Sequence, residues 1–436
     1  AGTYGIGREG INVKYRFYNA KILVMEQGCS IIEGEVWIDG SKIIYVGAEK
    51  ESDICWDEEI DAEGNLLMPG FKNAHTHSGM TFLRSMADDL PLHEWLENRV
   101  FPLEARLTPE HVYHLSKLAI MEYLTSGITS NFDMYLDNRN HAKASVEWGY
   151  RTVFCGSIND FTGSVPWLRE QYDTINTMGD LVSFRLGMHA EYTTKRETIE
   201  QLAELAHDMH EPVFLHLSET EKEVRECEQR HGMTPVRLLH KIGLFDFGGG
   251  GFHGVWLDEE ERQLLAEQDV SIVTCPCSNI KLASGIADLP ALQKAGVRLA
   301  IGTDGPASNN ALDMFREMYL TAALAKVKHR DAAVMDAAEV LRMATSGGAE
   351  VMGLSGCMTL SAGQIADLIL IDMKQPNMQP EHDIKKNLVY SGAKSNVKMT
   401  MVNGRILYRD GLFYLPEEAD EIYRHANEII AHMKDK

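Results

Sequence analysis

Short apolar runs alternate with helical stretches through the middle of the chain, from about residue 67 to residue 355. Eight of the runs have the length and the bounding turn residues of buried strands. These candidate strands are residues 67–70, 128–133, 152–156, 184–188, 213–216, 251–253, 271–274 and 299–302. Helical periodicity lies between them, at residues 109–125, 198–210, 234–242 and 258–268, with Thr108 and Asp258 as expected N-caps. Eight strands with intervening helices predict an α/β fold, a (β/α)8 TIM-like barrel.

Alternating segments at both ends of the chain predict a second, all-β unit. The candidate strands there are residues 21–25, 34–38, 42–47, 365–372 and 397–408, with hairpin turns at Asp39-Gly40 and Asn403-Gly404. We expect a composite β-sandwich domain at residues 14–66 and 360–415, the barrel at residues 67–355, and a C-terminal helix at residues 416–436. The first dozen residues contain four glycines and no apolar period, so we expect a frayed or non-native terminus there.

Composition excludes several classes of protein. A chain of 436 residues with 44% hydrophobic residues can bury a large core. Its 64 acidic and 42 basic residues give a net charge of −22, which repels phosphate backbones and anionic membrane surfaces. No apolar run approaches the roughly 20 residues that span a bilayer. Seven dispersed cysteines and the lack of a recognisable secretory leader favour a reduced, cytoplasmic setting.

The polar residues at the candidate strand ends are mostly of one chemical type. Four strand ends carry four imidazoles and two carboxylates, which are His75, His77, His216, Glu219, His253 and Asp304. In an extended segment residues i and i+2 point the same way, so His75 and His77 can face the barrel mouth together. Taken singly, each histidine has a structural alternative and Asp304 a turn alternative. Their joint placement at strand ends, where barrel chemistry occurs, predicts a metal site.

Imidazole and carboxylate ligands suit zinc or ferrous iron. Such a metal lowers the pKa of a bound water to about 7, and a carboxylate beside the ligands can then carry a proton to the substrate. The residues therefore predict a hydrolytic centre with one divalent metal. Zinc is the metal expected first, and iron is the alternative.

Three strings in this part of the chain, PGFKNAHTH, HLSET and GTDGPASNN, resemble those of the amidohydrolase superfamily. The string HTHSGMTFLRSMADDLPLHEWLENRVFPLEARLT narrows the resemblance to the group of methylthioadenosine and S-adenosylhomocysteine deaminases, with the chlorotriazine hydrolases as nearby relatives. The resemblance covers nearly the whole chain, including the split β domain. It implies a homo-oligomer and a small-molecule nucleoside substrate.

The resemblance also implies roles for single residues. The metal ligands would be His75, His77, His216 and Asp304. Glu219 would protonate the ring nitrogen of the substrate, and His253 with Asp304 would take the proton of the water. Glu104 would accept hydrogen bonds from the ribose hydroxyls, with an exposed acid at a helix start as the alternative. His189 would contact the substrate, with a buried hydrogen-bonded ring as the alternative. Arg169 would match, loosely, an arginine that holds a carboxylate. Trp95, Leu96 and Phe82 are candidates for an apolar pocket wall, with ordinary packing as the alternative.

The chain departs from the group at one position that bears on the substrate. Deaminases of S-adenosylhomocysteine hold its carboxylate with arginines, and residues 155–157 contain none. This absence weakens the assignment of S-adenosylhomocysteine and leaves adenosine, 5′-deoxyadenosine and 5′-methylthioadenosine open. Gly156 is alternatively expected to enlarge the pocket for another group.

The expected function is metal-dependent hydrolytic deamination of an adenine-type nucleoside to the inosine analogue plus ammonia. The candidate substrates are 5′-methylthioadenosine, S-adenosylhomocysteine, adenosine and 5′-deoxyadenosine. The alternative is a deaminase or chlorohydrolase of another aminated azine, of guanine or of a pterin. A non-catalytic binding barrel is disfavoured by the complete ligand set. A deaminase of flipped bases needs a basic path for nucleic acid, which the charge of −22 opposes.

Overall fold

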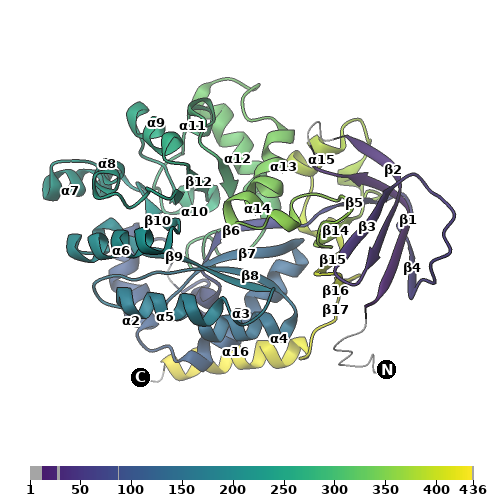
Figure 1. The fold of residues 1–436 in the computed structure, drawn as a ribbon, viewed down its shortest axis with the longest axis horizontal. Helices are drawn as coiled ribbons and strands as arrows, with labels where there is room; N and C mark the ends of the chain where they lie inside the picture. Colours follow the sequence, from purple (N-terminus) through teal and green to yellow (C-terminus); the bar gives the residue numbers. More distant parts are fainter. Residues whose placement is uncertain (1–11, 27–29, 87, 435–436) are drawn as a thin grey trace.

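The computed structural model describes residues 12–26, 30–86 and 88–434, and the larger unit is a nearly closed parallel barrel. Its strands pair in chain order: β6 (Phe71–Thr76), β7 (Ile128–Met134), β8 (Arg151–Cys155), β9 (Val182–Ala190), β10 (Val213–Leu217), β11 (Gly249–His253), β12 (Val270–Thr274) and β13 (Leu299–Ile301). β13 returns to lie against β6. Figure 1 shows the helices arranged around these strands. The predicted barrel is therefore confirmed. The expectation for the first dozen residues concerns a segment that, apart from Asn12, lies outside the described residues.

The first candidate strand was assigned to the wrong sheet. Residues 67–70 largely coincide with β5 (Leu66–Pro69), which pairs with β1 (Lys14–Leu23) and β14 (Leu368–Ile371) rather than with the barrel. The barrel begins with β6, directly after Gly70. The apolar run crosses from one sheet to the other through Pro69-Gly70 with no intervening polar segment, so periodicity alone could not separate the two strands. A Cβ at Gly70 would lie 2.1 Å from Thr129 Cγ2, so only glycine fits this crossing.

Strands from both chain ends form the second unit. Within the described residues the sheet has nine strands, and the remaining ones are β2 (Ile31–Asp39), β3 (Lys42–Gly47), β4 (Glu58–Asp61), β15 (Val397–Val402), β16 (Arg405–Arg409) and β17 (Leu412–Phe413). In Figure 1 the purple N-terminal strands lie beside the yellow-green C-terminal ones. One continuous hydrogen-bonded path joins β17 to β3, so the expected sandwich takes the form of a single sheet around its own apolar core.

The barrel helices include α3 (Pro109–Thr125), α4 (Arg139–Trp148), α5 (Val165–Ile175), α6 (Arg196–Met209), α7 (Glu221–His231), α8 (Pro235–Ile242), α9 (Glu259–Glu267), α10 (Pro276–Lys281), α11 (Leu289–Ala295), α12 (Met314–His329), α13 (Ala337–Ala344), α14 (Ser346–Met352) and α15 (Ile384–Tyr390). Four of them, α3, α6, α8 and α9, begin and end close to the predicted positions, and no bounds were predicted for the others. Thr108 and Asp258 are confirmed as N-caps, because their side chains accept hydrogen bonds from the third residue of α3 and α9. Within the described residues, no helix is long and apolar enough to cross a bilayer.

A short helical segment and the C-terminal helix cover one side of the barrel mouth. The segment consists of α1 (Leu92–Trp95), the π-helical turn η2 (Leu96–Val100) and α2 (Phe101–Glu104). The C-terminal helix α16 (Ala419–Lys434) packs along α3, as the yellow helix in Figure 1 shows. Side chains of both join one apolar cluster that includes Trp95 and Ile429. We call residues 92–104 the cap segment.

A buried ion pair joins the barrel to the sheet. The Arg151 Nε on β8 lies 2.6 Å from Asp367 Oδ2, and both side chains are almost fully buried. The Asn403 backbone amide donates to Asp367 Oδ1 at 2.7 Å. Lys72 lies nearby with its ammonium donating to the Thr129 hydroxyl at 2.7 Å, and burial lowers the pKa of this lysine. Asp367 is therefore the carboxylate that balances buried positive charge at this junction.

Candidate functional site

Residues from three strand ends converge at the carboxyl end of the barrel. His75 lies in β6 and His77 directly after it, His216 lies in β10, and Asp304 follows β13. The Asp304 Oδ1 lies 3.5 Å from His75 Nε2 and 3.2 Å from His77 Nε2. The Nε2 atoms of His77 and His216 lie 3.3 Å apart. The four side chains predicted as metal ligands are thus brought together, with their potential ligand atoms directed at one another.

Hydrogen bonds to the far ring nitrogens orient two of these histidines. His77 Nδ1 contacts the Met134 carbonyl at 2.5 Å, and His216 Nδ1 contacts the His189 carbonyl at 2.7 Å. A carbonyl only accepts, so both Nδ1 atoms carry a proton, and Nε2 is the atom of each ring that is directed at the cluster. This tautomer is the one that binds a metal through Nε2.

Asp304 is held in an equally defined way. The hydroxyls of Ser278 and Ser308 donate to its Oδ2 at 2.5 and 2.8 Å, and the Gly305 amide donates to its Oδ1 at 2.8 Å. Burial raises the pKa of Asp304, but the neighbouring histidines, His75 and His77 above all, outweigh this effect and hold the pKa well below its usual range. Its carboxylate is therefore an anion that can serve as a ligand.

His75 provides the test of whether a metal fits. Its ring is fully buried and stacks on Phe252 with centroids 3.8 Å apart. Within the described part of the chain, neither of its ring nitrogens has a hydrogen-bond partner. Burial lowers the pKa of His75 to about 3, so the ring is neutral. A buried neutral imidazole without a partner is unfavourable unless it ligates something, so the residues present fit a divalent metal.

Glu219 and His253 flank the cluster. The Glu219 Oε2 lies 3.7 Å from His253 Nε2, and Ser284 donates to Glu219 Oε1 at 3.3 Å. Burial raises the pKa of Glu219, which brings the carboxyl closer to the range in which it can both take and give a proton. His253 Nδ1 contacts Asn279 Oδ1 at 2.8 Å, so its proton on that side is fixed and Nε2 faces Glu219.

The backbone is left-handed at two of these residues. His253 has φ +78° and Asp304 has φ +56°. Side chains other than glycine seldom adopt this region, and such positions cluster at functional sites because the surrounding structure must hold them there. The turn interpretation of Asp304 was therefore correct for its backbone, while its side chain belongs to the cluster.

Some residues of the site carried no recognisable sequence signal. Asn279 in α10 contacts His253, and Ser308 in the turn after β13 contacts Asp304, and only the folded barrel brings them there. His141 lies in a helical stretch of the sequence, from which we expected a surface or capping residue, and this expectation is wrong. His141 is fully buried in α4, with Nδ1 3.5 Å from Asp133 Oδ1 behind the site. Its helical period could have indicated an inward face, but nothing in the sequence named its partner.

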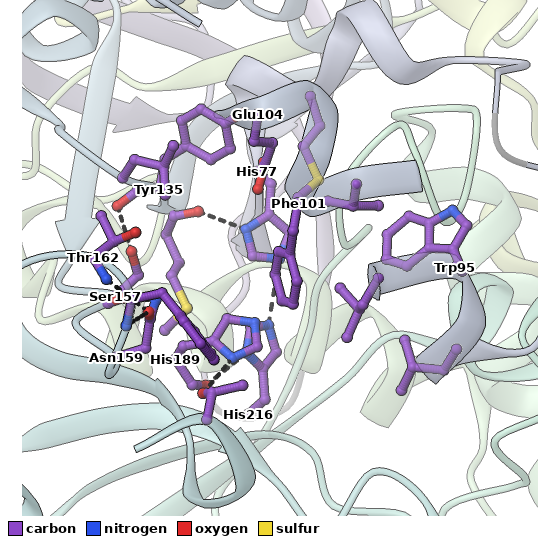
Figure 2. A pocket seen from close by; sticks show the side chains of 18 of the residues that line it. His77, Trp95, Phe101, Glu104, Tyr135, Ser157, Asn159, Thr162, His189 and His216 are labelled. Atoms are coloured by element: carbon purple, nitrogen blue, oxygen red, sulfur yellow. Dashed lines mark hydrogen bonds between the residues drawn. The ribbon is translucent and has the colours of Figure 1, made fainter. Parts of the chain in front are cut away.

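A cavity of about 690 Å³ opens above the cluster. Trp95 and Leu96 line it, as the sequence predicts, whereas Phe82 packs in the apolar cluster beneath and does not line it. In Figure 2, Trp95 lies across the cavity from Ser157, Asn159 and Thr162. A volume in this range accommodates a small-molecule ligand.

Glu104 and His189 both line this cavity. Burial raises the pKa of Glu104 to about 7, and among the described residues its Oε1 has no hydrogen-bond partner. Burial lowers the pKa of His189 to about 4, so the ring is neutral, and its Nδ1 hydrogen-bonds with Thr193 Oγ1 at 2.9 Å. A buried carboxyl oxygen without a hydrogen-bond partner in the wall of a cavity is suited to accept a hydrogen bond from a ligand.

Two expectations about the part of the cavity that would hold the 5′ substituent of the substrate are not met. Arg169 lies on α5 and pairs with Asp173, Nε to Oδ2 at 2.9 Å, with half of its side chain exposed. It is absent from the residues that line the cavity in the described structure, so its predicted contact with substrate is corrected. Gly156 does not enlarge the cavity either, because a Cβ there would lie 2.1 Å from Leu168 Cδ1 and 2.8 Å from the Gly187 carbonyl oxygen. Glycine is required at this position by packing.

Comparison with known proteins identifies the family. The model of the amidohydrolase family matches residues 66–407. The chain belongs to the amidohydrolase family. Within this family, the chain is 39% identical over 405 residues to the 5-methylthioadenosine/S-adenosylhomocysteine deaminase of Caldicellulosiruptor saccharolyticus, and the match covers 92% of this chain and 94% of the relative.

Solved amidohydrolase structures agree with this assignment. An adenosine deaminase from Xanthomonas campestris with bound zinc has a TM-score of 0.91 and 32% identity, covering 98% of this chain and 99% of its own. The atrazine chlorohydrolase of Arthrobacter aurescens has a TM-score of 0.87 at 22% identity, covering 95% of this chain and all of its own, which shows the shared fold alone. The resemblance to the superfamily and its deaminase group is confirmed.

Proposed function

We propose that this amidohydrolase is a metal-dependent deaminase of adenine nucleosides that releases ammonia and the inosine analogue. The observation that carries the proposal is the convergence of the three-histidine and Asp304 cluster with Glu219 at the floor of a nucleoside-sized cavity. The names of the relatives, a 5-methylthioadenosine/S-adenosylhomocysteine deaminase and an adenosine deaminase, support the same substrate class.

The divalent metal would be held by His75, His77, His216 and Asp304. It would act as a Lewis acid and activate water for attack. Zinc is our first assignment, since imidazole and carboxylate ligands suit it and the Xanthomonas structure contains zinc. Iron, which accepts the same ligands, is the competing assignment, and metal analysis of the purified protein separates the two.

The residues around the cluster move protons in our scheme. Water adds to C6 of the adenine ring, and His253 with Asp304 accepts a proton from it. Glu219 transfers a proton to the adjacent ring nitrogen N1, so that the ring does not accumulate negative charge. Transfer of the C6 hydroxyl proton to the amino group then lets ammonia leave and forms the C6 carbonyl of the inosine analogue. The sum is one water consumed and one ammonia formed for each nucleoside.

Two further residues would bind the nucleoside. Glu104 would accept hydrogen bonds from the ribose hydroxyls, which the unpartnered Oε1 supports. His189, neutral and held by Thr193, would contact the base. These roles separate nucleosides from free bases, since a base alone leaves Glu104 buried and unpaired.

We further propose the domain division drawn from sequence: residues 14–66 and 360–415 as one domain, residues 67–355 as the barrel, and residues 416–436 as a helical extension. We also propose a homo-oligomer in the cytoplasm that binds neither nucleic acid nor membranes. The free state of the six described cysteines is compatible with a reducing compartment. The net charge of −22 disfavours both excluded partners.

A substrate panel tests the proposed function. Metal-loaded protein is assayed for ammonia release from adenosine, 5′-deoxyadenosine, 5′-methylthioadenosine, S-adenosylhomocysteine, guanine and a pterin, and for chloride release from a chlorotriazine. We expect the highest kcat/KM on an adenine nucleoside. A clear preference for guanine, a pterin or the chlorotriazine would replace the proposal with the corresponding alternative.

A further inference from the structure

We propose that the cavity selects adenine nucleosides with an uncharged, apolar 5′ substituent, that it rejects a terminal carboxylate or phosphate there, and that Phe161 is the residue that contacts the substituent. This inference rests on the proposed function. The inference extends the proposed function by dividing the candidate substrates into those with an uncharged 5′ substituent and those with a charged one. It also assigns a specificity-determining residue.

The charges that line the cavity favour neutral substituents. Carboxylates come from Glu97, Glu104, Glu219 and Asp304. Among the described residues, no lysine or arginine lines the cavity. A carboxylate or phosphate that entered would lose its hydration, find no counter-ion and approach groups of its own sign. The cavity therefore discriminates against anions without any steric block.

The wall of the cavity is correspondingly apolar. Trp95, Leu96, Val100 and Phe101 of the cap segment line it. Across from the cap segment, in the loop that carries Asn159 and Thr162, Phe161 also lines the cavity with 81% of its surface exposed. This is the most exposed large apolar side chain in the described structure. An aromatic ring at a cavity rim with so little intramolecular contact has its surface available for a ligand.

The loop that presents Phe161 is fixed on both sides. Asn159 Oδ1 accepts hydrogen bonds from the backbone amides of Phe161 and Thr162, each at 2.9 Å. The Asp160 amide donates to the Thr193 carbonyl at 2.9 Å, and Asp160 Oδ1 accepts from the Lys195 amide at 2.9 Å. Because the backbone is already ordered, little conformational entropy is lost when the ring meets a substituent.

Two arginines near the cavity do not provide the missing cation. Arg106 follows the cap segment, and its guanidinium donates to the Met433 carbonyl at 3.0 Å, which ties it to α16. Arg99 lies in η2 and is exposed, but it is not among the lining residues. Arg99→Gln is therefore the matched control for charge, since it removes the nearest free cation of the cap segment without altering the wall.

The experiment compares four substrates on metal-loaded protein: 5′-methylthioadenosine, 5′-butylthioadenosine, S-adenosylhomocysteine and adenosine 5′-monophosphate. The butylthio compound matches the homocysteine side chain in length but carries no charge. We expect S-adenosylhomocysteine, whose amino-acid end is a zwitterion with a terminal carboxylate, and the anionic monophosphate both to have kcat/KM at least about 100-fold below that of 5′-methylthioadenosine, as an unpaired buried polar group typically causes. We expect the butylthio compound to stay within about tenfold of it, and Arg99→Gln to leave these ratios unchanged.

Variants of the rim test the contact residue. Phe161→Ala should lower kcat/KM for 5′-methylthioadenosine by about tenfold and leave adenosine within about threefold, whereas Phe161→Leu should retain most of the activity. Phe161→Ala should also weaken inhibition by the product 5′-methylthioinosine more than inhibition by inosine. Product inhibition is a binding readout that does not depend on turnover. Thr162→Arg, which adds a cation to the lining, should raise the S-adenosylhomocysteine to 5′-methylthioadenosine ratio at least about tenfold.

Three outcomes would overturn the inference. S-adenosylhomocysteine within about tenfold of 5′-methylthioadenosine would show that charge is not selected. Poor activity on both S-adenosylhomocysteine and the butylthio compound would show a limit of size instead. If Phe161→Ala lowered kcat/KM equally for adenosine and 5′-methylthioadenosine, Phe161 would not be the residue that contacts the substituent. A protein that deaminates none of the adenine nucleosides would reject the proposed function itself, which is distinguishable from all three.

Discussion

Glu104→Gln separates the contribution of a buried carboxylate to binding from its effect on stability. Glu104 lies in the cavity wall, and among the described residues its Oε1 has no hydrogen-bond partner. Glutamine preserves the size of the side chain and an acceptor oxygen but cannot ionise. If Glu104 binds the ribose, the variant should raise KM for adenine nucleosides far more than for free adenine, while metal content stays unchanged.

The effect on stability follows from the pKa of this residue. Burial raises the pKa of Glu104 from 4.5 to about 7, so the folded state binds more protons than the unfolded state between these values. The free energy of unfolding therefore falls as pH rises through this window. One pKa unit corresponds to about 1.4 kcal/mol, so full ionisation costs the folded state about 3 kcal/mol. Between pH 6 and pH 8.5 the same linkage gives a change of about 1.4 kcal/mol.

The assay is urea unfolding of metal-free wild-type and Glu104→Gln protein at pH 6 and pH 8.5. Metal-free protein is used because a divalent cation beside His77 would also favour the carboxylate. We expect the variant to gain stability relative to wild type by about 1.4 kcal/mol between the two pH values. If the free energies of unfolding of Glu104→Gln and wild type differed by the same amount at both pH values, Glu104 would not be a carboxyl whose ionisation at the cavity destabilises the fold.

The other predictions concern the chemistry, the metal and the junction between the two units. Glu219→Gln should lower turnover by at least about 100-fold with metal content retained, as expected for a positioned acid–base group, and near-normal turnover would exclude the shuttle role. His216→Ala should lose the metal together with activity, measured by elemental analysis of the purified protein, and a full metal content would contradict the ligand assignment. Asp367→Asn should destabilise the protein by about 3–5 kcal/mol in urea unfolding because it leaves Arg151 buried and unpaired. Asp173→Asn, at an exposed pair, is its control and should change stability little.

The sequence predicted the barrel well because each of its strands is a local feature. Seven candidate strands overlap barrel strands, and their ends locate His216 and Asp304, since the carboxyl ends of parallel strands share one edge, whereas His75 and His77 lie at the end of β6, which was not predicted. Where two strands follow each other without a turn, as β5 and β6 do at Gly70, the apolar pattern could not tell which sheet each joins. Local periodicity therefore sufficed for the architecture but not for the crossing between the two sheets.

Long-range contacts account for what the sequence could not provide. Asn279 reaches His253 and Ser308 reaches Asp304 only after the barrel closes, and the pairing of Arg151 with Asp367 joins positions 216 residues apart. The residues expected to contact the 5′ substituent of the substrate also could not be predicted from the sequence. Arg169 has the right chemistry for a carboxylate but lies on the outer face of α5, and Gly156 is small because Leu168 and Gly187 leave no space.

The most direct test of the central claim is a zinc titration of metal-free protein with 5′-methylthioadenosine as substrate, followed by ammonia release and by the ultraviolet change from adenine to hypoxanthine. The account predicts activity that rises to a plateau at one zinc per chain, with one ammonia formed for each hypoxanthine nucleoside. Activity without added metal, a plateau at two metals per chain, or no ammonia from this or any other adenine nucleoside would contradict it.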